Sequence, residues 1–209
     1  MSLDFGVTAF VTLFVIIDPI GLAPLFLALT HGATTRQRRA IGVRALAIGF
    51  FLLALFGLGG ERLLDAVGID MAAFRIAGGL LLFLTAVDML FERRQPRREN
   101  TAHQADALPD PTVFPLATPL IAGPGALATM VLLIGQHPGD YAAQAVVYAA
   151  MTAVLGICYV LFLAGGLIER VLGPTGINVV TRLFGMLLAA LSVQFVVEGL
   201  RAFGFGSGG

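Results

Sequence analysis

The first apolar run of this chain, from Phe5 to Leu29, is interrupted in its middle by residues that a membrane-spanning helix normally avoids. The run is long enough to cross a bilayer, which takes ~20 residues. An ionised carboxylate such as Asp18 costs at least ~2.5 kcal/mol near the bilayer centre. Pro19 and Pro24 lack the N–H group that a continuous helix needs. The run therefore predicts a broken helix, with Asp18 as the N-cap of its second half and Pro19 in the first helical position.

A break of this kind leaves backbone polar groups unpaired at membrane depth. Such groups are tolerated only where protein buries them or where they line a wet cavity. Transporters use broken helices to bind small charged substrates at the membrane midplane. The alternative interpretation is a proline-kinked helix that Asp18 caps and that binds no ligand.

The whole chain has the composition of a polytopic membrane protein. Its 209 residues are 57% hydrophobic and 12% charged, with a mean hydropathy of +0.90. Six apolar runs, each of about 20–25 residues, predict an all-α fold of six tilted transmembrane helices. These runs are Phe5–Leu29, Ile41–Gly60, Met71–Phe91, Val113–Gly135, Ala142–Ala164 and Val179–Arg201.

Charge and cysteine usage exclude several function classes. The formal net charge is zero, so no basic surface predicts binding to nucleic acid. The single cysteine, Cys158, excludes a disulfide framework and a cysteine-rich metal site. The chain contains no Walker A, His-Glu-x-x-His or Gly-x-Ser-x-Gly motif, so nothing predicts ATP-driven transport or a familiar hydrolase. We expect no cofactor.

The six runs divide into two halves of three. Residues 1–91 form the first half, residues 92–112 a polar linker, and residues 113–209 the second half. The third and sixth runs share an arginine (Arg75 or Arg182), a glycine three residues on, paired leucines, and a hydroxyl residue ten on. Because each half has an odd number of spans, the halves would lie in opposite orientations. The sequence therefore predicts two inverted three-helix repeats.

The fourth run is also interrupted, at Gly123-Pro124-Gly125. Pro19 of the first run matches Pro119 by proline spacing but Pro124 by depth in the membrane, and we favour the match by depth. Two interrupted spans at corresponding places indicate a binding site near the midplane. The first and fourth helices are therefore both expected to break near mid-membrane.

The arginines predict the orientation of the chain. The first, third and fifth loops and their flanks carry Arg36, Arg38, Arg39, Arg44, Arg93, Arg94, Arg97, Arg98 and Arg170. The positive-inside rule makes this side cytoplasmic. We therefore expect a cytoplasmic linker and two external termini.

The candidate substrate site lies between the two breaks. Glycine has no Cβ, so a ligand can approach the backbone closely at Gly21, Gly123 and Gly125. A half-helix that begins at Pro124 would direct N–H groups at a carboxylate, and Asp18 could accept an ammonium group or carry a coupled proton. The Gln194 amide lies near mid-span, where it could line the cavity or form a hydrogen bond between helices. The candidate substrate-binding residues are Asp18, Pro19, Gly21, Gly123, Pro124, Gly125 and Gln194.

Four further charged residues have depths that suggest ion pairs. Arg75 and Glu198 lie toward the outer face, and Asp88 and Arg182 toward the inner face. Charges within membranes usually survive by pairing with one another. We therefore predict the structural pairs Arg75–Glu198 and Asp88–Arg182, which would link the two repeats.

Three segments of the chain resemble the MarC family of six-span bacterial and archaeal inner-membrane proteins. They are Asp18-Pro-Ile-Gly-Leu-Ala-Pro24, Arg75-Ile-Ala-Gly-Gly79 and Ala122-Gly-Pro-Gly-Ala126. The resemblance extends over the whole chain. It implies a secondary transporter of small neutral amino acids, of the glycine and alanine type, that is coupled to protons.

Two other functions stay open at this point. One is export of another small metabolite. The other is an intramembrane enzyme that uses Asp18 and Asp88, although their different depths argue against a shared proton. We expect a transporter and no enzyme, with a small-molecule substrate and the lipid bilayer as partners. The sequence leaves a homo-oligomer open.

Overall fold

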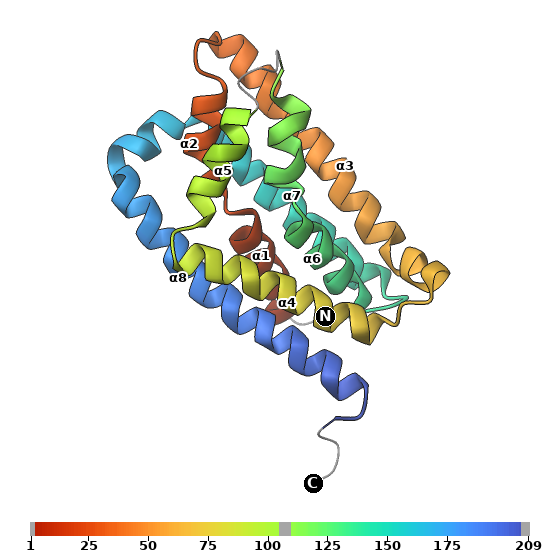
Figure 1. The fold of residues 1–209 in the computed structure, drawn as a ribbon. Helices are drawn as coiled ribbons and strands as arrows, with labels where there is room; N and C mark the ends of the chain where they lie inside the picture. Colours follow the sequence, from red (N-terminus) through yellow and green to blue (C-terminus); the bar gives the residue numbers. More distant parts are fainter. Residues whose placement is uncertain (1–2, 105–109, 206–209) are drawn as a thin grey trace.

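The structure is a computed structural model that describes residues 3–104 and 110–205, and these residues form a bundle of helices (Figure 1). The predicted all-α fold is confirmed for this part of the chain, which contains no strand. In chain order the elements are α1 (Leu3–Ile17), α2 (Pro19–Leu29), α3 (Thr35–Val67), α4 (Met71–Leu90), α5 (Arg94–Gln104), η1 (Thr112–Ile121), α6 (Pro124–Gly135), α7 (Tyr141–Leu163) and α8 (Gly165–Ala202).

The predicted break in the first apolar run is confirmed. Helix α1 ends at Ile17, and α2 begins at Pro19, which has no N–H group to donate back to α1. Asp18 between them has a left-handed backbone with φ of 58°. Its carboxylate accepts a hydrogen bond from the Gly21 N–H at 3.1 Å, so Asp18 is the N-cap of α2, as expected.

The fourth run is broken as well. The segment η1 is an irregular helix in which Phe114 and Thr118 have extended backbone angles. It meets α6 at an angle of 53° across Ala122 and Gly123. Helix α6 begins at Pro124, as α2 begins at Pro19. Each break therefore ends in a half-helix whose first residue is a proline, in agreement with the match by depth.

Five helical segments of the described chain are long and apolar enough to span a membrane, and six if η1 and α6 count as one bent span. The structure thus supports the predicted number of spans; the inverted relation between the two halves stays a prediction. Helix α8 begins earlier than the predicted sixth run and bends at Gly173, where φ is 60°, just before Pro174.

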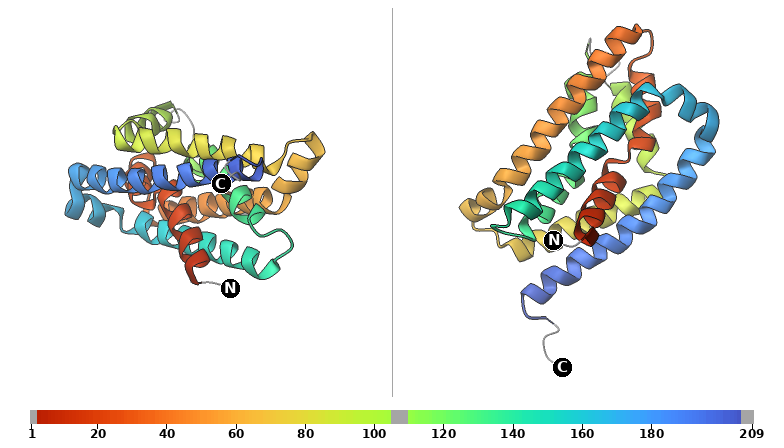
Figure 2. Two further views of the ribbon diagram at one scale, coloured as in Figure 1. Left: turned by 90° about the horizontal axis from the view of Figure 1, so that it is seen from below. Right: turned by 180° about the vertical axis from the view of Figure 1, so that it is seen from behind.

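Helices α4 and α8 lie side by side and form one outer layer of the bundle (Figure 2). Glycines allow their backbones to approach closely, as is common between membrane helices. A Cβ on Gly79 of α4 would lie 2.8 Å from the Ser192 carbonyl oxygen of α8, and one on Gly199 of α8 would lie 2.9 Å from that of Ala72. The pair therefore depends on small residues at these positions.

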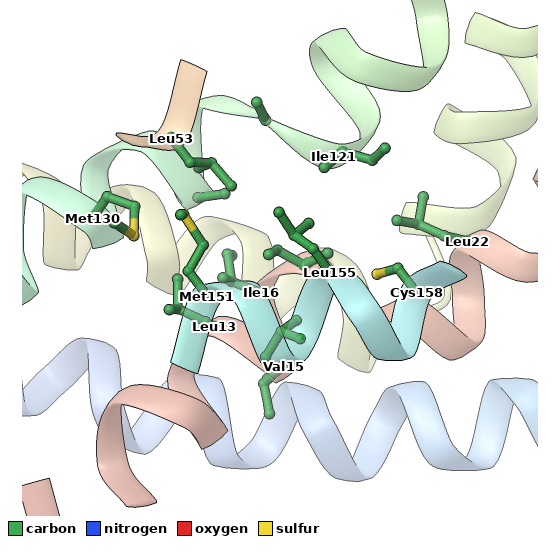
Figure 3. Close-up of a cluster of buried hydrophobic side chains, with 14 of the residues drawn as sticks. Leu13, Val15, Ile16, Leu22, Leu53, Ile121, Met130, Met151, Leu155 and Cys158 are labelled. Carbon is green, nitrogen blue, oxygen red and sulfur yellow. The ribbon is translucent and has the colours of Figure 1, made fainter. Parts of the chain in front are cut away.

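The buried core lies around the two broken spans. Its side chains come mainly from α1, α2, η1, α6 and α7, and Figure 3 shows Leu155 and Cys158 of α7 in the same cluster as Ile121 and Leu22. Phe26 of α2 stacks on a ring of α7 with 4.2 Å between centroids. By contrast, α3, α4 and α8 expose large apolar side chains on their outer faces, including Phe51, Leu58, Leu84 and Met186. This distribution suits a surface that lipid covers.

The predicted polar linker contains a helix, α5, which the sequence analysis did not expect. Three residues separate it from the end of α4, and it contacts α2, α4 and η1 (Figure 1). Residues 105–109 of this linker lie outside the described residues. Helix α5 matters most for the site, because it reaches the break between α1 and α2.

Candidate functional site

Arg98 of α5 forms an ion pair with Asp18 at the first break. Its Nη1 lies 3.0 Å from Asp18 Oδ2, and its Nη2 donates to the Ile17 carbonyl oxygen at 3.1 Å. The side chain of Asp18 is 0% exposed and that of Arg98 is 8% exposed. The charge that made Asp18 costly at membrane depth is therefore balanced by a guanidinium from a segment 80 residues away.

Two other side chains of α5 bind the backbone of the same break. Arg94 Nη2 donates to the Ile16 carbonyl oxygen, and its Nη1 lies 2.8 Å from the Met89 Sδ. Gln95 Nε2 donates to the Gly21 carbonyl oxygen at 3.3 Å. The last carbonyls of a helix have no intrahelical partner, and cations favour this negative end of the helix dipole. Through Arg94 and Arg98, helix α5 therefore satisfies the carbonyls at the end of α1 that the break leaves open.

A cavity of about 190 Å³ lies between this cluster and the second break. Helix α1 contributes Ile16, α4 contributes Thr85 and Asp88, and the second break and α6 contribute their backbone. The complete lining is Ile16, Thr85, Asp88, Arg94, Arg97, Arg98, Pro119, Leu120, Ile121, Gly123, Pro124, Gly125 and Ala126. Three of the predicted site residues, at the second break, thus line the cavity directly.

The lining is predominantly positive. It carries three guanidinium groups but only one carboxylate, Asp88, which pairs with Arg97. Since Asp18 balances Arg98, the charge of Arg94 is the one left in excess. Arg94 donates hydrogen bonds to two neutral acceptors, the Ile16 carbonyl oxygen and the Met89 sulfur. Gly125 and Ala126 lie in the first turn of α6, where N–H groups lack intrahelical acceptors. The cavity therefore favours an anionic group.

Burial affects both inner arginines of α5. Burial, together with the neighbouring charge of Arg98, lowers the pKa of Arg94 to about 9. Burial also lowers the pKa of Arg98, and the Asp18 carboxylate opposes this shift. Because a group with a pKa near 9 is still protonated at neutral pH, Arg94 enters the cavity as a cation.

The predicted site residues of the first break do not line the cavity. Asp18 is buried behind Arg98, and neither Pro19 nor Gly21 is part of the cavity lining. Gly21 is close to α5, because a Cβ there would overlap Asp18 Oδ2 and would lie 2.6 Å from Gln95 Nε2. The first break thus contributes to the site through the side chains of α5 that cover it.

Gln194 is not part of the cavity. Its amide is exposed on α8 and donates to Glu198 Oε1 at 3.0 Å, one helical turn away. The prediction used only its depth along the span. Depth does not determine which face of the helix a residue occupies, and here the amide occupies the outer face.

The predicted charge pairs differ from those in the structure. Asp88 pairs with Arg97 of α5, and Arg182 pairs with Glu92 at 2.8 Å. Within the described residues no salt bridge joins Arg75 to Glu198, and the Arg75 Nε is buried without a hydrogen-bond partner. Asp88 and Arg182 therefore do not need each other as counterions, because Arg97 and Glu92 supply the opposite charges.

Sequence reasoning missed the three residues of α5 that bind the first break. One signal was present, because Arg94 and Arg98 are four residues apart and so share one face of a helix. The polarity of the linker, however, suggested a solvated segment. As to metals, no group of three His, Cys, Asp or Glu side chains with metal-binding geometry occurs among the described residues.

Broken helices, an exposed apolar surface and a small charged cavity are together the features of a polytopic membrane protein. The sequence matches the family described as "MarC family integral membrane protein" over residues 3–203. The chain belongs to this family, as the resemblance predicted.

Proteins from bacteria and archaea are similar to this chain over nearly their whole length. The "UPF0056 membrane protein YvbG" of Bacillus subtilis strain 168 is 35% identical over 206 residues, which is 96% of each chain. A "UPF0056 membrane protein" of Archaeoglobus fulgidus is 37% identical, over 95% of this chain and 93% of its own. The "UPF0056 inner membrane protein YhgN" of Escherichia coli K12 is 33% identical, over 93% and 95% respectively. No solved structure matches the chain at significant similarity.

Proposed function

We propose that this protein is a secondary transporter that carries small neutral amino acids, of the glycine and alanine type, across the inner membrane. The observation that carries the proposal is the cavity between the two breaks, which places guanidinium groups, a carboxylate and the start of α6 around a small volume. A zwitterion needs this combination of opposite charges. In this proposal the protein acts as a transporter and not as an enzyme. It lies in the bilayer and has no nucleic-acid partner, and a homo-oligomer stays open.

In the cavity as the structure has it, we propose one orientation for an amino acid of this type. Its carboxylate binds Arg94 and the N–H groups of Gly125 and Ala126, because charged hydrogen bonds of this kind are short and strong. Its ammonium group binds the carboxylate of Asp88. A methyl side chain can pack against Ile16, which is apolar and lines the same space.

The size of the cavity supports a small substrate. Sites for drug-sized ligands measure ~300–1,000 Å³, whereas this cavity has about 190 Å³. This volume suits glycine or alanine much better than an amino acid with a large side chain.

We propose that protons drive transport. A buried carboxylate that loses its charged partner tends to be neutralised by protonation. Asp18 is such a group when Arg98 moves away and no substrate ammonium group takes its place, which makes Asp18 the candidate proton carrier.

Two alternatives have less support. Export of another small metabolite would use the same cavity in the opposite direction. An intramembrane enzyme with paired aspartates has little support, because Asp18 pairs with Arg98 while Asp88 pairs with Arg97. Two carboxylates with separate counterions do not share a proton as an aspartyl dyad does.

Uptake into proteoliposomes tests the proposal. Labelled glycine and alanine are expected to accumulate when an inward proton gradient is imposed, and to equilibrate more slowly without it. Leucine and phenylalanine serve as size controls and should be excluded. Chemical conversion of glycine without any gradient would favour an enzyme, and absence of glycine and alanine uptake under both conditions would contradict the proposal.

The orientation of the chain gives a separate prediction. The N-terminal end of α1 and the C-terminal end of α8 lie at the same end of the bundle as the turns at 68–70 and 136–140. The turn at 30–34 lies at the opposite end (Figures 1 and 2). Following the positive-inside rule, a reporter fused at Gly209 should be active outside the cytoplasm, and one inserted between Gln95 and Leu108 inside it. A cytoplasmic Gly209 would contradict both the orientation and the inverted repeats.

A further inference from the structure

Over the part of α5 whose side chains the structure describes, the helix is attached to the bundle mainly through polar contacts. Among its residues from Arg94 to Asn100, only Arg98 is fully buried, and Arg94 and Gln95 are half-buried. All three bind the first break, at the carbonyls of Ile16, Ile17 and Gly21 and at the Asp18 carboxylate. Elements of this kind, with few buried apolar contacts, lie at the low-stability end of a fold and open most readily.

There is open space on both sides of α5. Its arginines line the 190 Å³ cavity of the proposed substrate site. Its opposite side, with Gln95 and Glu99, lines a second cavity of about 380 Å³ that α2 and α8 complete. Helix α5 therefore lies between two open spaces and is not packed into the core on either side.

The turn before α5 has the features of a hinge. Glu92 has φ of 57°, in the left-handed region that non-glycine residues rarely adopt. Its side chain is fixed to α8 by the ion pair with Arg182 at 2.8 Å. The end of α4 is thus anchored. Within the described residues, the helix that follows is held by polar side chains: Arg94, Gln95 and Arg98 bind the first break, and Arg97 pairs with Asp88 of α4.

The Arg98–Asp18 ion pair, which holds α5 against the first break, combines one positive and one negative charge, as a zwitterionic amino acid does. Opening α5 alone separates the Arg98 guanidinium from the buried Asp18 carboxylate and leaves both without a partner. A zwitterion can replace both partners at once, because its carboxylate matches Arg98 and its ammonium group matches Asp18. A ligand with a single charge replaces only one of them.

We infer that α5 is a movable gate between the substrate cavity and the linker side, and that a zwitterionic substrate opens it by exchanging partners with the Arg98–Asp18 ion pair. This inference rests on the proposed function for the identity of the substrate. The existence of the gate rests on the contacts of α5 alone.

Cysteine labelling of α5 in proteoliposomes tests the gate. Gln95→Cys places a thiol on the side of α5 that faces α2, and Glu99→Cys places one on an exposed part of the same helix. The unmodified protein is the blank, because its single Cys158 is buried. A membrane-impermeant maleimide is applied to the linker side, and the labelling rate is measured with glycine, acetate, methylammonium, and the last two together.

Glycine is expected to raise the rate at Gln95→Cys by about tenfold, which is what the loss of one charged hydrogen bond allows, and to leave Glu99→Cys unchanged. Acetate and methylammonium should have no such effect. Removing both charges, with Asp18→Asn and Arg98→Met together, should give a raised rate that no longer responds to glycine. If this double variant does not fold, Arg98→Lys, which keeps the charge but has a single nitrogen, is expected to weaken closure in the same direction.

The outcomes separate the two proposals. A glycine-independent rate at Gln95→Cys in a protein that takes up glycine overturns partner exchange and leaves the proposed function intact. A raised rate in the double variant, with no glycine uptake by the unmodified protein, supports the gate and contradicts the proposed substrate. Equal opening by methylammonium or acetate alone overturns the requirement for a zwitterion.

Discussion

Replacing Arg98 by alanine is expected to lower the free energy of unfolding by ~3–5 kcal/mol, because removal of one partner of a buried ion pair leaves the other charge uncompensated. That other charge belongs to Asp18, whose side chain is 0% exposed. The substitution also removes the hydrogen bond to the Ile17 carbonyl. Thermal or denaturant unfolding in detergent measures the loss.

Two variants make this prediction specific. Arg93→Ala removes an exposed arginine of the same linker, which lies 5.9 Å from the Phe91 ring, and should cost no more than ~1 kcal/mol. Combining Asp18→Asn with Arg98→Met removes both charges, and Asn retains an oxygen that can cap α2. This pair should recover much of the stability. Equal losses for the single and double variants would show that the ion pair is not the cause.

The second large effect is expected from Gly123→Ala. A Cβ at this position would lie 2.6 Å from the Pro119 carbonyl oxygen, a backbone atom of the same break. The backbone at the second break must therefore shift, and overpacking of this kind typically costs ~1–3 kcal/mol. Because Gly123 lines the cavity, uptake of glycine should fall as well.

Gly59→Ala is the matched control for this substitution. It adds the same methyl group within α3, where nothing lies within 4 Å of the new Cβ. Replacing glycine by alanine inside a helix stabilises it by roughly 0.5–1 kcal/mol. Gly59→Ala should therefore keep or raise stability and leave uptake unchanged. If Gly123→Ala behaves like Gly59→Ala, the break tolerates a side chain and the close approach has no importance.

Local chemistry explains which features of the fold could be predicted from the sequence. Proline is favoured in the first turn of a helix and an aspartate before it can cap that turn, so the break at Asp18 follows from neighbouring residues. At the second break Pro124 likewise begins a helix, although its N-cap Gly123 has no capping side chain. Apolar length likewise predicts the spans, because the bilayer fixes the number of residues needed.

Contacts between distant segments could not be predicted in this way. Arg98 and Asp18 are 80 residues apart, and a polar linker is more often solvated than docked. Depth along a span suggested Gln194 as a ligand and Asp88 with Arg182 as a pair. Helix face and competing partners decide such contacts, and here Asp88 has Arg97 and Arg182 has Glu92. These choices depend on where α5 docks, which the sequence alone does not reveal.

The ion pair across the first break also has a consequence for how the chain enters the membrane. Asp18 is in the first span to leave the ribosome, and its counterion Arg98 follows 80 residues later. At ~5–20 residues per second, synthesis of the intervening chain takes roughly 4–16 s. During this interval the first span must either wait at the insertion machinery or enter the bilayer with Asp18 protonated. Helix α5 thus completes the insertion of a segment that was made long before it.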